Sequence, residues 1–167
     1  MKRRVGVPEE AILATQMNIA VLFQLHGRPE EAMQTHRDVA SGYARLYGNE
    51  HEMSLIAALN YASSLGQLRR YAEVKSLLCK TMPVSRRVLG AGHVNSLKMR
   101  TIYAGALFTD PAATLDDLRE AVNILEDTER TARRVLGGAH PTTVDVGVYL
   151  RNSRAALHAR ETPSTPV

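Results

Sequence analysis

Apolar residues recur along this chain at the spacing of an amphipathic helix. Leu13, Met17, Ala20 and Val21 lie one or two helical turns apart, so they form one stripe that a helix can bury. The stripe returns further along the chain with residue size largely kept, in the columns Leu13, Leu55, Leu97, Val144 and Ala20, Ala62, Ala104. A second helical stretch follows each of the first three copies. The pattern therefore predicts an all-α chain of repeated helix pairs.

Glycine-marked junctions separate the repeats. Gly48, Gly90 and Gly137 follow similar arginine-containing segments and lie 42 and 47 residues apart, and a histidine three residues after each keeps the same spacing. Glycine is favoured just after a helix because it adopts positive φ without steric cost. A period of about 40 residues made of two helices is typical of an α-solenoid, in which each helix pair packs on the next.

The register of the repeat predicts the domain organisation, with about seven helices in all. We expect one superhelical domain over 1–160, with units at about 8–48, 50–90 and 93–137 and a terminal helix over 142–160. Charged residues in that helix, Arg151 among them, are consistent with a solubilising cap. Residues 1–5 match the last turn of a preceding second helix, and 161–167, with two prolines, are expected to form a disordered tail.

Two irregularities interrupt the repeat. Pro83 falls inside the second helix of its unit, where proline costs about 3 kcal/mol, so we expect a kink or a break there. Five extra residues lengthen the last interval, and the register places them across 109–113. Thr114 and Asp117 resemble a capping box that restarts the helix after this loop.

Composition narrows the range of functions. The chain has 167 residues, a net charge of +4, 44% hydrophobic residues and one cysteine, Cys79. This composition is typical of a globular protein, and a single cysteine excludes an internal disulfide. The longest apolar run, 19–23, is too short to span a membrane, and no signal peptide follows the basic start. We expect a cytoplasmic protein that does not associate with membranes.

No residues have catalytic or metal-ligand spacing. The junction histidines His51, His93 and His140 invite a metal site, but repeats stack about 10 Å apart, too far to share one ion. A structural role at the junctions is therefore favoured. Cys79 has no histidine at an equivalent position to activate it, and there is no glycine-rich phosphate loop. We expect no catalytic residue, metal or cofactor, and hence no enzyme activity.

The repeated motifs resemble a known family. Each repeat has Leu-Gly or Tyr-Gly before its histidine, and single repeats add further motif positions: Asn18-Ile19-Ala20, Asn60-Tyr61-Ala62, Glu31-Ala32, Glu120-Ala121 and His140-Pro141. Over about residues 3–160 the chain resembles tetratricopeptide repeats of the kinesin light chain type. The resemblance implies a right-handed superhelix whose concave groove binds an extended or helical peptide of another protein. It also implies that Asn18 and Asn60 hydrogen-bond the peptide backbone, whereas Ile102 and Tyr149 occupy that position in the later units.

The residues on this face support a groove independently of the family. Helical spacing through each Asn position gives a mixed stripe of apolar, amide and hydroxyl side chains, which suits peptide binding. The candidate groove residues are Asn18, Val21, Ile56, Asn60, Ser63, Lys98, Ile102, Tyr149 and Asn152. The alternative is that Asn18 and Asn60 are merely solvated or cap a neighbouring turn.

We therefore interpret the chain as a non-enzymatic scaffold that binds a peptide segment of a partner protein in the groove. The alternative is a regulatory or oligomerisation segment of a larger multidomain protein, which stacks or self-associates through its solenoid ends. Arginine pairs at 3–4, 86–87 and 133–134 would form a basic ridge that attracts an acidic peptide, unless they only offset the helix dipoles. Nucleic acid is not favoured as a partner, because no aromatic residues interleave with the arginines.

Overall fold

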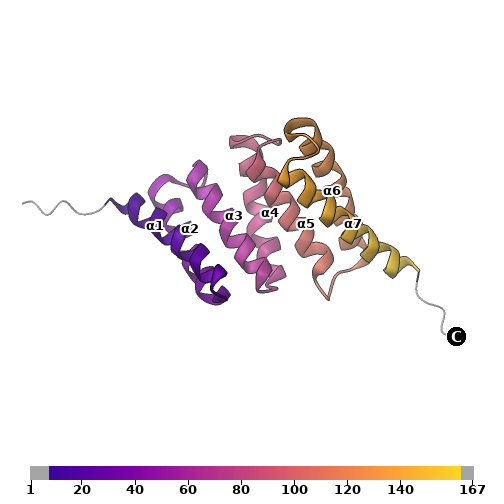
Figure 1. Cartoon of the computed structure of the whole chain (residues 1–167), viewed down its shortest axis with the longest axis horizontal. Coiled ribbons are helices and arrows are strands. Elements are labelled where there is room, and N and C mark those ends of the chain that lie inside the picture. The colour runs from indigo at the N-terminus through magenta and orange to yellow at the C-terminus, as the bar shows by residue number, and fades with distance from the viewer. Residues whose placement is uncertain (1–7, 163–167) are drawn as a thin grey trace, which may run out of the picture.

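Seven helices fill the part of the chain that the structure, a computed structural model, describes, residues 8–162. They follow one another as a row of antiparallel neighbours (Figure 1). Their bounds are α1 Glu9–Leu25, α2 Pro29–Tyr47, α3 Glu52–Gln67, α4 Tyr71–Val88, α5 Val94–Thr109, α6 Leu115–Leu136 and α7 Pro141–Glu161. These described residues contain no strand, so the predicted all-α repeat fold is confirmed.

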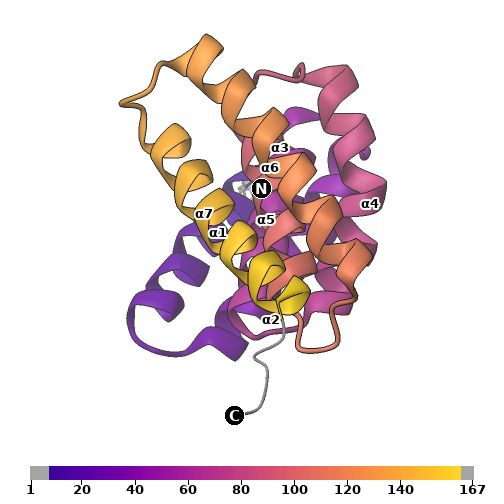
Figure 2. The same ribbon diagram turned by 90° about the vertical axis from the view of Figure 1, so that its right-hand side faces the viewer.

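The helices pack in two ways. Every helix packs against the next in sequence, and α3, α5 and α7 also stack on one another, while α1 makes no comparable contact with α3. Figure 2 shows α7 as the outermost helix at the C-terminal end. The core follows the predicted columns: Ala20, Ala62 and Ala104 are fully buried, because only a small side chain lets neighbouring helices approach closely.

Each repeat junction is built by its glycine and its histidine. Gly48, Gly90 and Gly137 have φ of 84°, 97° and 87°, the left-handed region that glycine adopts freely. At the next helix start, the imidazole Nδ1 of His51, His93 and His140 accepts a hydrogen bond from the backbone N–H two residues on, at 3.1–3.2 Å. The histidines therefore cap α3, α5 and α7, which confirms their structural role.

Pro83 does not break its helix. α4 continues from Tyr71 to Val88 through the proline, so of the predicted kink or break the break is excluded. Pro83 is exposed, and the carbonyl that loses its N–H partner belongs to Cys79, which is also exposed. Water can satisfy that carbonyl, which lowers the cost of the missing hydrogen bond.

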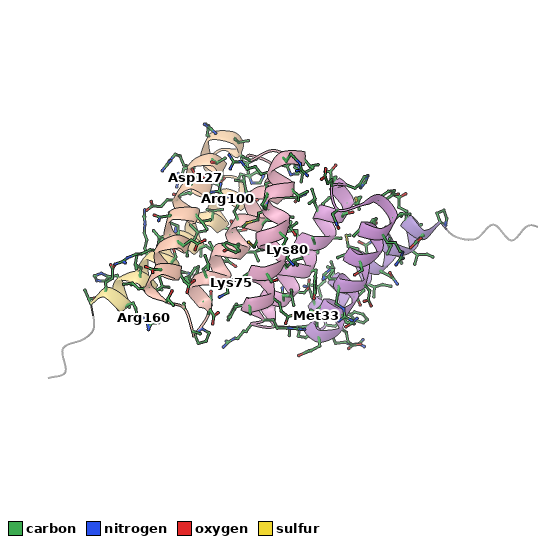
Figure 3. The ribbon with its side chains drawn as sticks, turned by 180° about the vertical axis from the view of Figure 1, so that it is seen from behind. Met33, Lys75, Lys80, Arg100, Asp127 and Arg160 are labelled. Carbon is green, nitrogen blue, oxygen red and sulfur yellow. The ribbon has the colours of Figure 1, made fainter. Side chains whose placement is uncertain are left out.

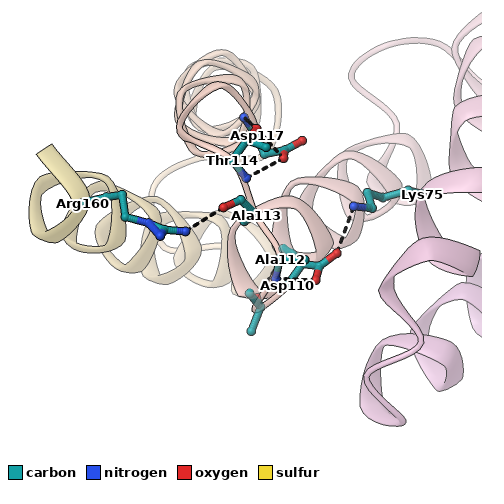
Figure 4. Close-up of polar contacts among 9 residues, drawn as sticks. Lys75, Asp110, Ala112, Ala113, Thr114, Asp117 and Arg160 are labelled. Atoms are coloured by element: carbon teal, nitrogen blue, oxygen red, sulfur yellow. Dashed lines mark hydrogen bonds and ion pairs between the residues drawn. The ribbon is translucent and has the colours of Figure 1, made fainter.

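The loop between α5 and α6, residues 110–114, overlaps the predicted insertion at 109–113, whose first residue, Thr109, ends α5, and the loop is held from both sides (Figure 4). Asp110 accepts a hydrogen bond from the Ala112 backbone N–H at 3.0 Å and pairs with Lys75 of α4, also at 3.0 Å; both contacts lower the pKa of its carboxyl group. Arg160 of α7 donates to the Ala113 carbonyl at 2.7 Å. The predicted capping box of Thr114 and Asp117 is present at the start of α6.

Two predictions fall wholly or largely outside the described residues. These are the final helical turn at 1–5 and the disordered tail at 161–167, of which only Glu161 and Thr162 are described. Glu161 is the last residue of α7. No helix in residues 8–162 combines the length and apolar character needed to cross a bilayer.

Candidate functional site

The candidate groove residues lie on the odd-numbered helices. Asn18 and Val21 are on α1; Ile56, Asn60 and Ser63 on α3; Lys98 and Ile102 on α5; Tyr149 and Asn152 on α7. All of them are exposed or half-buried, so none is part of the fully buried core. Their side chains are therefore accessible to a partner.

Three of these residues meet in one hollow. Ser63, Ile102 and Tyr149 come from α3, α5 and α7 and line a hollow of about 300 Å³. The ring of Tyr149 covers Gly105, where a Cβ would lie only 2.7 Å from the ring, and it meets Phe108 edge-on at 6.2 Å. Gly105 is therefore needed for this placement of Tyr149. The other six candidate residues do not line this hollow.

The amides of Asn18 and Asn60 form no side-chain hydrogen bond within residues 8–162. Asn18 is exposed and Asn60 is half-buried, and neither caps a helix in that part of the chain. Both amides thus keep their donors and acceptors available, as backbone recognition of a peptide requires.

A polar network that the sequence did not predict joins the first three helices. Gln24 Nε2 of α1 donates to Ser64 Oγ of α3 at 3.0 Å, and Ser64 Oγ lies 2.7 Å from Nδ1 of His36 on α2. His36 is buried, its Nε2 has no partner among the described residues, and burial lowers the pKa of its imidazole. In the sequence, only the position of His36 within an amphipathic stripe indicates that its side chain is buried.

Two hollows that the sequence analysis missed lie between the even-numbered helices. The larger, about 690 Å³, is bounded by α4 and α6 with Tyr103 of α5 at its base; the smaller, about 400 Å³, is bounded by α2 and α4 with Tyr61 of α3. Tyr61 and Tyr103 are equivalent positions of successive repeats. The hollows arise because the odd helices stack closely whereas the even helices are spread apart.

Charge distinguishes the two hollows. One wall of each hollow is the even helix that follows the tyrosine-bearing helix in sequence. On that wall, Lys80 of α4 in the smaller hollow and Asp127 of α6 in the larger hollow occupy equivalent positions (Figure 3). Arg100 donates to Asp127 at 2.7 Å and lowers the pKa of that carboxyl group. Arg86 and Arg134 also line the larger hollow and form no ion pair with a described residue.

The predicted basic ridge is only partly within the described residues. Arg87 pairs with Glu50, and Arg133 pairs with Glu129 at 2.8 Å, so one arginine of each pair is neutralised. Arg3 and Arg4 lie outside residues 8–162. Within that range no three His, Cys, Asp or Glu side chains are grouped closely enough to bind a metal ion.

This combination defines a helical repeat protein with accessible mixed surfaces, and comparison with known proteins identifies the repeat. Residues 12–52 match the family described as tetratricopeptide repeat, the repeat that the motifs predicted. Repeats of this family commonly mediate protein–protein interactions and are generally not catalytic.

A solved structure has the same fold. BtubC (BKLC) from P. vanneervenii superposes with a TM-score of 0.61 at 12% sequence identity, over 99% of this chain and 70% of that chain. At this identity the similarity concerns the fold alone. No curated protein matches the sequence.

Proposed function

We propose that this chain is a non-enzymatic scaffold that binds a peptide segment of a partner protein along the candidate groove residues. The observation that carries the proposal is the convergence of Ser63, Ile102 and Tyr149 from three helices on one hollow. An apolar side chain of a peptide can enter this hollow against Ile102 and Tyr149, while Ser63 offers a hydroxyl group.

The unpaired amides extend the proposed site beyond the hollow. Asn60 is one helical turn before Ser63 on α3, and Asn18 is at the equivalent position on α1. The peptide would run across the odd helices, with its main chain bonded by the two amides. Lys98 and Asn152 then supply polar contacts at the edges.

The test is a peptide selection with the full chain, using a random peptide library displayed on phage. Affinities of the selected peptides are measured by fluorescence anisotropy for the wild type and an Asn18→Ala, Asn60→Ala double variant. We expect the double variant to weaken binding at least about tenfold, because two main-chain hydrogen bonds are lost. Asn123→Ala, an exposed asparagine on α6, is the matched control and should bind like the wild type. Circular dichroism checks that all three are equally helical.

Two results would contradict the proposal that the groove binds a peptide. One is a selection that yields no binder. The other is a set of binders whose affinity the double variant does not change, which would place the binding surface elsewhere.

A second candidate function, association through a solenoid end, has its own supporting observation. α1 exposes Ile12, Ile19 and Leu22 at the N-terminal end of the row (Figure 1). Such an apolar face is typical of an interaction surface. Sedimentation at several concentrations tests for self-association, and Leu22→Glu should abolish any dimer formed through this face.

A further inference from the structure

The smaller and the larger hollow are two copies of one feature of the repeat. Each has a tyrosine-bearing odd helix as its floor and the two neighbouring even helices as its walls. Most positions that line the smaller hollow also line the larger one, 42 or 47 residues later in the sequence. A side chain that is present in only one of the two hollows is therefore not needed to form this feature.

Two arginines distinguish the larger hollow from the smaller one. Arg86 on the α4 wall stands where the smaller hollow has Ala44, and Arg100 on the α5 floor stands where it has Ala58. Because the smaller hollow forms with alanine at both positions, neither arginine is required by the packing of the helices. The arginines change instead what the larger hollow can bind.

One carboxylate holds these cations and does not neutralise them. Arg100 is half-buried and donates to Asp127 of the α6 wall at 2.7 Å, and Figure 3 shows the two residues side by side. Arg130 also approaches Asp127, at 3.8 Å, and the charge of Arg86 is near enough to lower the pKa of the same carboxyl group. Neither Arg86 nor Arg134 has an ion pair of its own with a described residue. The lining therefore has an excess of positive charge around a fixed guanidinium group.

The positive charge gathers at one end of the larger hollow. Arg86 and Arg134 lie in the last turns of α4 and α6. These two helices both run antiparallel to α5, so their last turns meet at the same end of the hollow. Glu120, the other carboxylate of the lining, is two helical turns before Asp127 on α6 and marks the opposite end.

The middle of the larger hollow is apolar. Met82 and Ile124 line it from the α4 and α6 walls, and Tyr103 forms its floor. All three side chains are half-buried and lie at the edges of core clusters that do not cover them completely. A ligand that covers them removes apolar surface from water. A volume of about 690 Å³ is in the range of small-molecule sites.

We propose that the larger hollow binds a small amphipathic anion, a molecule with an apolar body and one carboxylate or similar group at its end. The apolar body packs on the half-buried side chains in the middle, and the anionic group is bound by Arg86, Arg100 and Arg134. Arginine suits this role because its planar guanidinium group can donate two parallel hydrogen bonds to a carboxylate. The site shares no residue with the candidate groove and does not depend on it.

The charges of the lining favour a ligand with a single anionic group. Glu120 and Asp127 would repel the further carboxylates of an acidic peptide that filled the hollow from end to end. The smaller hollow is a poorer site for the same ligand. Its Arg37 and Lys80 come from opposite walls, no arginine is fixed at its floor, and its volume is about 400 Å³.

The test uses the fluorescent dye anilinonaphthalene sulfonate, which has an aromatic body and one sulfonate group. Titration of the full chain should show one saturable site with a Kd of about 10–100 µM, as expected for a ligand of this size. Octanoate should displace the dye at a lower concentration than octanol or acetate does, because only octanoate combines an apolar chain with a charge. Octanol or acetate that displaces the dye as well as octanoate would overturn the proposal.

A pair of matched variants locates the dye. The Arg86→Gln, Arg134→Gln double variant should weaken dye binding at least about fivefold, because it removes two cations beside the sulfonate. The control is the Arg37→Gln, Lys80→Gln double variant, which removes the same charge from the smaller hollow and should bind like the wild type. All four side chains are exposed, so both variants should keep the thermal unfolding midpoint of the wild type.

Three results of the titrations would overturn the proposal. The first is the absence of saturable binding to the wild type. The second is unchanged binding to the Arg86→Gln, Arg134→Gln variant, which would place the dye elsewhere. The third is equal weakening in both double variants, which would indicate attraction by net charge alone. None of these results affects the proposed groove, because peptide binding to the asparagine variants tests it separately.

Discussion

The two ends of the solenoid expose the same kind of helix in different ways. α1 and α7 are both odd-numbered helices, and among residues 8–162 each has one covered and one uncovered side. The uncovered side of α1 presents Ile12, Ile19 and Leu22. That of α7 presents Val144 and Val148, with Arg151 one helical turn after Val148.

Arg151 decides the difference between the ends. It occupies the position of Ala20, Ala62 and Ala104, which are fully buried where a following even helix packs. A long cation at that point keeps a neighbouring helix at a distance and would need a buried counter-ion. Exposed aliphatic residues occur on both helices, so Arg151 is what distinguishes the exposed side of α7 from that of α1.

The largest loss of stability is expected when arginine, the residue at position 151 of α7, is placed at the equivalent buried position of α3. Ala62→Arg should destabilise the fold by more than about 4 kcal/mol, because it buries an unpaired charge between closely packed helices. Urea unfolding followed by circular dichroism measures the loss. Arg151→Ala, the reverse change at the exposed position, should stay within about 0.5 kcal/mol. Equal losses of stability from the two substitutions would show that position 151 is as closely packed as position 62.

Covered and uncovered copies of one position provide the next comparison. Val146→Asp on α7 should cost about 3 kcal/mol, because this fully buried side chain packs under α6. Thr15→Asp on α1, the equivalent exposed position, should cost less than about 0.5 kcal/mol. Thermal unfolding of both variants in the same buffer makes the comparison. A large loss from Thr15→Asp would mean that this face of α1 is already covered.

The helix caps should have a smaller effect. His140→Ala removes the hydrogen bond to the Thr142 backbone N–H at the start of α7 and should cost about 1 kcal/mol. Because Pro8 at the start of α1 provides no side-chain cap, the C-terminal end alone gains this contribution. The control is His158→Ala, at an exposed histidine in the last turn of α7, which should change the free energy of unfolding very little at pH 8. A loss from His140→Ala no larger than that of the control would contradict the capping role.

The smallest expected effect is a pH dependence of the stability, which arises from His36 near the N-terminal end. His36 is buried and its pKa in the folded state is lowered below 6.5 by burial, so the unfolded chain binds the proton more readily. The stability from neutral His36 is complete above pH 6.5 and is lost as the pH falls through the lower folded-state pKa.

Urea unfolding between pH 7.5 and 5.5 measures this dependence. His36→Gln should flatten the profile within this window, whatever its effect on stability at pH 7.5. An unchanged profile in the variant would assign the dependence to other groups.

Local features of the fold were predictable because they depend on residues close together in sequence. The positive φ of Gly137 and the capping box of Thr114 and Asp117 each involve a few neighbouring positions. At Pro83 a kink or a break was predicted and the helix does not break, since the cost of proline depends on whether water reaches the Cys79 carbonyl, which only the folded helix decides. The groove residues remain a prediction, although the structure brings Ser63, Ile102 and Tyr149 together.

By itself, the sequence determined the helix pairs, their period and the residues that end and cap them, because helical periodicity and glycine conformation act over a few residues. The tertiary structure alone decided which odd helices stack, where the even helices leave hollows, and how Lys75 and Arg160 hold the loop between α5 and α6. It also decided that Ile12, Ile19 and Leu22 of α1 are exposed among residues 8–162. These features depend on how helices about 40 residues apart are placed against each other, and no local pattern encodes that placement.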